Sequence, residues 1–98
     1  MASLTIVSDK DNVATTTCDL EAGTVIFSKQ GGEEIIVPIN VNLSLGHKVA
    51  IRSIPKGDLV IKYGESIGVA TCDIAKGDHV HTHNVESQRG RGDLGEKA

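Results

Sequence analysis

Short apolar stretches recur along the chain at intervals of about ten residues, and most are separated by turns that contain Gly. They are rich in β-branched side chains and partly alternate apolar with polar positions, as half-buried β-strands do. The clearest stretches are residues 24–28, 34–39, 48–52 and 67–71. No window of about eleven residues keeps a helical period without Gly or Pro. The pattern predicts an all-β fold of about eight short strands, either a compact barrel or a bent sheet.

A short unit recurs in which an apolar residue is followed by two spacers, a Gly and then a Val within three positions. Its copies start at Leu20, Ile54 and Ile74, and residues 45–49 form a shorter relative. Gly supplies positive φ in tight turns, so each unit is predicted to be a turn that leads into a strand. Pro38 lies inside its apolar stretch, which predicts an edge strand or a bulge.

Cys18 and Cys72 occupy equivalent positions, two residues before the units that start at Leu20 and Ile74. The two thiols show no metal-binding spacing, and a reducing cytosol keeps such thiols free. Because free cysteines are among the most buried residue types, we expect both to be packing residues. The alternative is a redox or disulfide role.

Composition narrows the possible partners. The 98 residues include one Phe, one Tyr and no Trp, so the core must be built from Val, Ile, Leu and Ala. Such a small domain buries little surface, and we expect it to form a homo-oligomer or to bind a larger partner. The net charge is −3 and the basic residues are scattered, which argues against nucleic acid.

Neither a membrane span nor a signal peptide is visible. No apolar stretch approaches the ~20 residues of a spanning helix, and the first residues lack a basic start followed by a long apolar run. A cytoplasmic protein is therefore expected. After Val85 the chain changes character, with a single large apolar side chain in residues 86–98. We predict one folded domain over residues 1–85 and a flexible tail over residues 86–98.

Three of the four histidines lie within five positions, at His79, His81 and His83. On a strand, alternate residues share a face, so the three imidazoles are predicted to meet one ligand. Three imidazoles with an open position are typical of catalytic zinc, and imidazole also suits iron, copper and nickel. The alternative is an exposed strand that carries polar residues on its solvent face.

Two further polar groupings lie beside Gly turns, where a rigid sheet often holds binding groups. They are His47-Lys48 and Lys62-Tyr63. Lys48, Lys62 and Arg52 are candidates to bind a carboxylate, against the alternative of ordinary solvated charges. Tyr63 suits either a core position or proton donation. The chain has no nucleophile elbow, phosphate-binding loop or Cys-x-x-Cys, so it is expected to supply one wall of a site.

Three motifs together resemble the amino-terminal SAF domain of altronate and galactarate dehydratases, and also the small subunit of sulfolactate sulfo-lyase. They are Gly-His-Lys-Val-Ala at 46–50, Lys-Tyr-Gly-Glu-Ser-Ile-Gly at 62–68 and Gly-Asp-His-Val-His-Thr-His-Asn at 77–84. The resemblance covers roughly residues 5–85. It implies a compact β-clip fold of short strands and Gly turns. It also implies the removal of water from a small hydroxy acid next to its carboxylate, with a divalent metal, often iron, in the complete enzyme.

The resemblance also implies roles for single residues. By motif, the expected catalytic residues are His81, His83 and Asn84. The same two histidines are candidate metal ligands. The expected substrate-binding residues are His47, Lys48, Lys62 and Tyr63. Individual roles within each group stay open.

In the fused dehydratases a long catalytic segment follows this domain, and here the chain ends soon after it. The resemblance therefore implies a small subunit of a two-subunit hydro-lyase, inactive alone, whose large catalytic subunit holds the base and most metal ligands. One alternative is the small subunit of (2R)-sulfolactate sulfo-lyase, which eliminates sulfite instead of water. Another is a non-enzymatic SAF module that binds a ligand.

Overall fold

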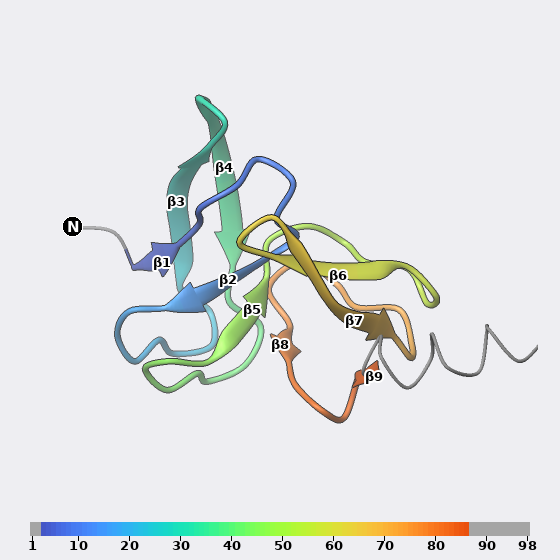
Figure 1. Cartoon of the computed structure of the whole chain (residues 1–98). Coiled ribbons are helices and arrows are strands. Elements are labelled where there is room, and N and C mark those ends of the chain that lie inside the picture. Colours follow the sequence, from blue (N-terminus) through green and yellow to red (C-terminus); the bar gives the residue numbers. More distant parts are fainter. Residues whose placement is uncertain (1–2, 87–98) are drawn as a thin grey trace, which may run out of the picture.

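The computed structural model describes residues 3–86, which form nine short strands and no helix (Figure 1). The strands, in chain order, are β1 (Leu4–Thr5), β2 (Val13–Thr16), β3 (Val25–Gln30), β4 (Glu33–Pro38), β5 (Lys48–Ala50), β6 (Leu59–Lys62), β7 (Glu65–Ala70), β8 (His79–Val80) and β9 (Val85–Glu86). The all-β prediction is confirmed. Within the described range, no helix is long and apolar enough to cross a membrane.

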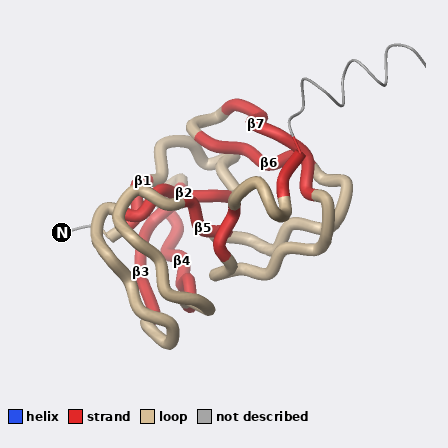
Figure 2. The backbone as a smooth tube through the Cα atoms, turned by 90° about the horizontal axis from the view of Figure 1, so that it is seen from below, coloured by secondary structure: helices blue, strands red, loops and turns tan. Residues whose placement is uncertain are grey.

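The strands form three small antiparallel sheets. A central sheet has the order β1-β2-β5-β8, β3 pairs with β4 as a hairpin, and β7 lies between β6 and β9. Figures 1 and 2 show the β3–β4 hairpin at one end of the domain and the β6–β7 hairpin at the other, with β2 and β5 between them. Pro38 closes β4 in a sheet of only two strands, so the predicted edge position is confirmed. Of the predicted tail, Glu86 pairs with Val69 in the third sheet, and residues 87–98 lie outside the described part.

The recurring unit of the sequence forms the turns. It occurs in four full copies, whereas the sequence suggested three copies and a shorter relative at residues 45–49. The fourth copy begins at Leu43, which is 4% exposed, whereas Leu45 is 62% exposed. In every copy the first residue is buried and forms a bridge, and the Gly three positions later has φ between 87° and 95°. The first residues are Leu20, Leu43, Ile54 and Ile74. Gly is required for a further reason at position 77, where a Cβ would collide with the carbonyl of Pro38.

The prediction that both cysteines are buried is wrong, since Cys18 and Cys72 are free and exposed. The apolar residue two positions after each cysteine, Leu20 or Ile74, is buried in the core instead. The intervening Asp19 and Asp73 hold the neighbouring turns, because each accepts a hydrogen bond at 2.9 Å from a backbone N–H of the facing unit. The repeat therefore places its thiols in bends at the surface.

The apolar side chains form two core clusters, one on each face of the central sheet, since Ala14 and Val49 belong to the first and their strand neighbours Val13 and Ala50 to the second. The first contains Leu4, Ala14, Leu20, Val37, Ile39, Leu43, Val49 and Ile51. The second contains Val13, Ala50, Ile54, Val60, Ala70, Ile74 and Val80. Burying each larger side chain contributes about 1.5–3 kcal/mol. The second cluster includes Val80, which lies between His79 and His81 of the predicted functional segment.

Candidate functional site

All four histidines of the chain lie close together, although they come from two distant segments. The ring of His79 is at the centre, 4.9 Å from the ring of His47 between centroids. The rings of His81 and His83 follow at 5.5 and 5.7 Å from His79. Nδ1 of His47 and Nε2 of His79 are 2.9 Å apart, a hydrogen-bonding distance. The pairing of β5 with β8 causes this arrangement, since Val49 is the register partner of His79.

The prediction of one strand with three histidines on a single face is wrong. β8 ends at Val80, and residues 81–84 form a turn. The side chain of Asn84 explains the turn: its Oδ1 accepts a hydrogen bond from the backbone N–H of His81 at 2.9 Å, and its Nδ2 donates to the carbonyl of His79 at 2.8 Å. Such local bonds give the backbone an alternative to a sheet ladder. The turn nevertheless keeps the rings of His81 and His83 near that of His79.

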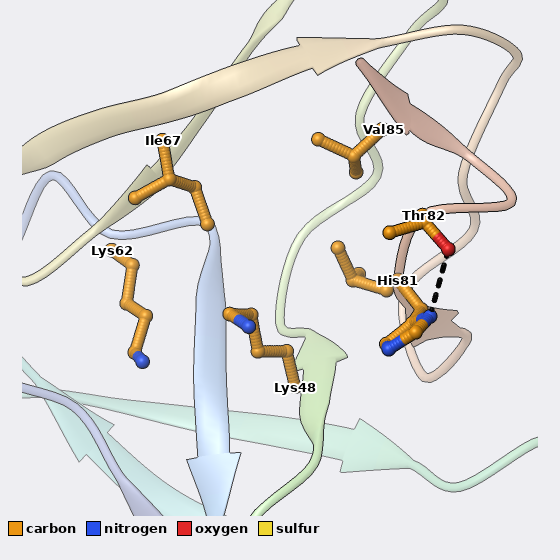
Figure 3. Close-up of a pocket in the computed structure, with 7 residues that line it drawn as sticks. Lys48, Lys62, Ile67, His81, Thr82 and Val85 are labelled. Carbon is orange, nitrogen blue, oxygen red and sulfur yellow. Dashed lines mark hydrogen bonds between the residues drawn. The ribbon is translucent and has the colours of Figure 1, made fainter. Parts of the chain in front are cut away.

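A pocket of about 460 Å³ lies beside the histidines (Figure 3). Its walls combine cationic and hydrogen-bonding side chains with apolar ones: Lys48, Lys62, Ile67, Val80, His81, Thr82 and Val85. Figure 3 shows Lys62, Lys48 and His81 along one border and Ile67 and Val85 along another. Oγ1 of Thr82 is 3.1 Å from Nδ1 of His81, which leaves Nε2 of that ring available for a ligand. This combination suits a small anion that carries a short carbon chain.

The structure brings three of the predicted site residues into the pocket wall, namely Lys48, Lys62 and His81. His47 and His83 flank His79 and do not line the pocket. Asn84 is only 5% exposed, and both ends of its amide hold backbone groups. Asn84 therefore shapes the turn that presents His81.

One predicted carboxylate-binding residue lies outside the pocket, and three residues of the pocket wall were not predicted. Arg52 lies elsewhere, where it donates a hydrogen bond to Oε1 of Gln30 at 2.6 Å. The apolar wall was not predicted from the sequence, in particular Ile67 and Val85, because their strand patterns do not differ from those of core positions. Thr82 was not predicted either, although a hydroxyl between two histidines was the available signal.

Tyr63 and Gly64 form the two-residue turn between β6 and β7, with φ values of 55° and 79°. Positive φ at both positions is what a type I′ hairpin turn requires, and it is unusual for a bulky residue such as Tyr. Tyr63 is 45% exposed, so the core alternative for it is wrong. Its ring lies 4.7 Å from Nζ of Lys62, a cation–π contact that orients the ammonium group.

Asp11, a residue that was not predicted from the sequence, holds the turn at Tyr63 and Gly64 in place. Its carboxylate is fully buried and accepts hydrogen bonds from the backbone N–H groups of Gly64 at 2.7 Å, Ser8 at 3.1 Å and Val7 at 3.2 Å. Burial raises the pKa of Asp11, but these donors outweigh burial, and the pKa lies below its usual 3.8. The charged carboxylate thus fixes the β6–β7 turn, and with it the position of Lys62.

The described residues do not form a recognisable metal centre. Among them, no group of three or more His, Cys, Asp or Glu side chains is placed to hold a metal ion. The short contact between His47 and His79 is a ring-to-ring hydrogen bond, which engages one nitrogen of each. The metal role of His81 and His83 stays a prediction, and the geometry of this chain adds no support to it.

His79 has a pKa below its usual 6.5, first because burial disfavours the charged ring and second because His47, His81, His83 and Lys48 repel a further positive charge. The folded domain therefore binds this proton less readily than the unfolded chain. As pH falls through 6.5, the unfolded chain gains its proton first, and the free energy of unfolding decreases. Above that pH the shift has no effect on stability.

We therefore expect urea unfolding between about pH 5 and 8 to show a loss of stability on the acid side. His79→Gln should flatten this dependence, because it removes the ring with the lowered pKa. His83→Gln is the control: this exposed ring contributes only one of the neighbouring charges, so most of the dependence should remain. Equal slopes for His79→Gln and the unmodified protein would contradict the assignment.

Comparisons with known proteins show the family of this chain. Residues 2–88 match the family described as the altronate/galactarate dehydratase SAF domain. The altronate dehydratase of Escherichia coli (strain K12) is 43% identical over 77 residues, which is 79% of this chain. That of Bacillus subtilis (strain 168) is 31% identical over 87 residues, or 89% of this chain. The (2R)-sulfolactate sulfo-lyase subunit alpha of Paracoccus pantotrophus is 48% identical over 48 residues, which is 49% of this chain and 72% of that protein.

The matched regions are small parts of the dehydratases. This chain spans 15% of the Escherichia coli protein and 17% of the Bacillus subtilis protein. Most of each dehydratase therefore has no counterpart in this chain, whereas the sulfo-lyase relative is itself a subunit by name.

Proposed function

Because the chain belongs to the altronate/galactarate dehydratase family of SAF domains, we propose that it is the small subunit of a sugar-acid dehydratase. In this proposal it completes the active site of a separate, larger catalytic subunit and is inactive alone. Two findings support the arrangement: the dehydratases are mostly made of other sequence, and a relative of similar size is named a subunit. The cytoplasmic location stays a prediction.

The pocket beside the histidines is the observation that carries the proposal. Lys48 and Lys62 offer two ammonium groups for the carboxylate of a hydroxy acid, and the apolar wall accepts its carbon chain. Removing the proton next to a carboxylate builds up enediolate charge, which fixed cations stabilise. Nε2 of His81 is the group on this chain best placed to bind or transfer a proton at the substrate.

The partner subunit supplies the rest of the reaction in this proposal. It holds the base and most ligands of the divalent metal, expected to be iron, as the family resemblance implies. His81 and Thr82 are exposed, so a large chain can cover them and exclude water from the pocket. This chain thus contributes cations, one imidazole and an apolar wall.

A second candidate function follows from the sulfo-lyase relative. The same pocket would bind the carboxylate of (2R)-sulfolactate, and the same proton abstraction would expel sulfite instead of water. A third candidate is a SAF module that binds a ligand without any enzyme partner. The pocket residues do not separate the leaving groups, so the product must be measured.

The test is an assay of the domain co-purified with the large catalytic chain encoded with it. Altronate, galactarate and sulfolactate are supplied in turn, and the 2-keto product and sulfite are quantified. Keto product from a sugar acid without sulfite supports the dehydratase, and sulfite from sulfolactate establishes the sulfo-lyase instead. Failure of any large chain to co-purify, together with ligand binding by the isolated domain, would leave the non-enzymatic module.

A further inference from the structure

The β3–β4 hairpin has apolar side chains on both of its faces. On the inner face, Ile26 and Ile35 pack against the first core cluster. On the outer face, Val25, Phe27 and Ile36 are 47%, 68% and 48% exposed. A hairpin that needs only one buried face usually carries polar residues on the other, and contiguous exposed apolar side chains mark an interaction surface. The only Phe of the chain lies at the centre of this face.

The outer face is built from three rows of directly opposed residues. Phe27 is the register partner of Ile36, Lys29 of Glu34, and Val25 of Pro38. Because alternate residues of a strand share a face, these rows follow one another along the same side of the hairpin. The face therefore has an apolar part near the body of the domain and one Lys–Glu row near its tip.

This pattern is complementary to itself. Consider a second copy related by a two-fold axis that runs parallel to the strands, with the outer faces about 10 Å apart, the usual distance between packed sheets. The rotation places β3 of one protomer over β4 of its partner at the same row. Phe27 then packs on the partner's Ile36, and Lys29 meets the partner's Glu34. Each contact occurs twice, as in any isologous dimer interface.

We propose that the domain forms a two-fold dimer through the outer face of the β3–β4 hairpin. Charge complementarity identifies a second copy as the occupant. A facing surface attracts the Lys29–Glu34 row only if it places an acidic group over Lys29 and a basic group over Glu34. The two-fold rotation places the second copy's own Glu34 and Lys29 at these two points. The inner face covers the body, so the outer face points away from it and leaves room for the second copy. Figures 1 and 2 show this hairpin at the end of the domain opposite to β6–β7, so the proposal is independent of the proposed function.

Sedimentation velocity of the purified chain tests the proposal. The interface is small, so we expect a dissociation constant of about 1–100 µM and a shift from monomer to dimer across that range. Phe27→Lys should keep the protein monomeric at about 200 µM, a concentration at least twice the expected dissociation constant of the unmodified dimer. Leu45→Lys is the matched control, since Leu45 is 62% exposed on a different turn and this variant should dimerise normally. Thermal unfolding of each variant verifies that the domain is folded.

Charge exchange gives a sharper test, because it separates contacts between copies from those within one hairpin. Lys29→Glu and Glu34→Lys should each be monomeric alone, since like charges then face one another across the two-fold axis. A one-to-one mixture of the two variants should form the heterodimer, in which opposite charges face one another again at both positions. The proposal is overturned by an unmodified protein that stays monomeric at about 200 µM, or by a mixture that stays monomeric. If Phe27→Lys instead prevents binding of the large catalytic chain while the unmodified domain is monomeric, the face belongs to that chain.

Discussion

In the proposed two-subunit enzyme, Asn84→Ala should abolish most of the activity, and it should destabilise the domain by about 2 kcal/mol. The change leaves the partly buried carbonyl of His79 and the N–H of His81 without their side-chain partners. The turn over residues 81–84 then loses the interactions that present His81 to the pocket. Turnover with the large subunit and urea unfolding of the isolated domain measure the two effects separately.

Two further variants show whether the effect comes from the turn. Asn84→Asp keeps the acceptor for the N–H of His81 and removes the donor to His79, so it should lose only part of the activity. Asn42→Ala is the control, because Asn42 also accepts a hydrogen bond from a backbone N–H, that of Ala22 at 2.8 Å, and does not line the pocket. An Asn84→Ala variant with full turnover would show that the turn does not position a catalytic group.

Lys62→Met and Lys48→Met should each raise the KM for the hydroxy acid by about 10- to 100-fold. Each loses a charge-assisted hydrogen bond to the substrate carboxylate, which contributes about 1.5–3 kcal/mol, and Met preserves the apolar stem of the side chain. The value of kcat should fall further if the same ammonium group also stabilises enediolate charge. Initial rates over a range of substrate concentration separate the two constants.

Lys56→Met is the matched control for these variants. Lys56 is exposed on the turn that starts at Ile54, and it does not line the pocket. Its backbone N–H, which donates to Asp73, is unaffected by the change. A KM that is unchanged in Lys62→Met and Lys48→Met would remove the pocket from the substrate site, whatever the histidines do.

Much of the fold follows from local sequence. The β-branched stretches and the Gly turns predicted the strands at 25–30, 33–38, 48–50 and 65–70 to within two residues. Turn chemistry is local, since a positive φ can be recognised at a single Gly. Local sequence also explains why the burial of the cysteines was predicted wrongly. A repeat shows that two positions are equivalent, but it does not show which of its positions faces the core.

The candidate site required long-range information that one sequence does not contain. Spacing showed that His79, His81 and His83 lie together, but His47 reaches them only through the register of β5 with β8. The strand predicted to continue to His83 ends at Val80, and a turn follows because Asn84 bonds the backbone of His79 and of His81. The contact of the buried Asp11 with the turn beside Lys62 has no local signal either, since Gly64, whose N–H it accepts, lies 53 positions along the chain.

In the proposed function this chain supplies half of an active site, and addition of the chain to the purified large subunit tests that proposal most directly. We predict that the large subunit alone has no measurable turnover, and that activity rises with added domain until the two chains are equimolar. A His81→Ala domain should bind equally well, compete with the unmodified domain and restore little activity. Full turnover by the large subunit alone would contradict the central claim, since its active site would then be complete without this chain.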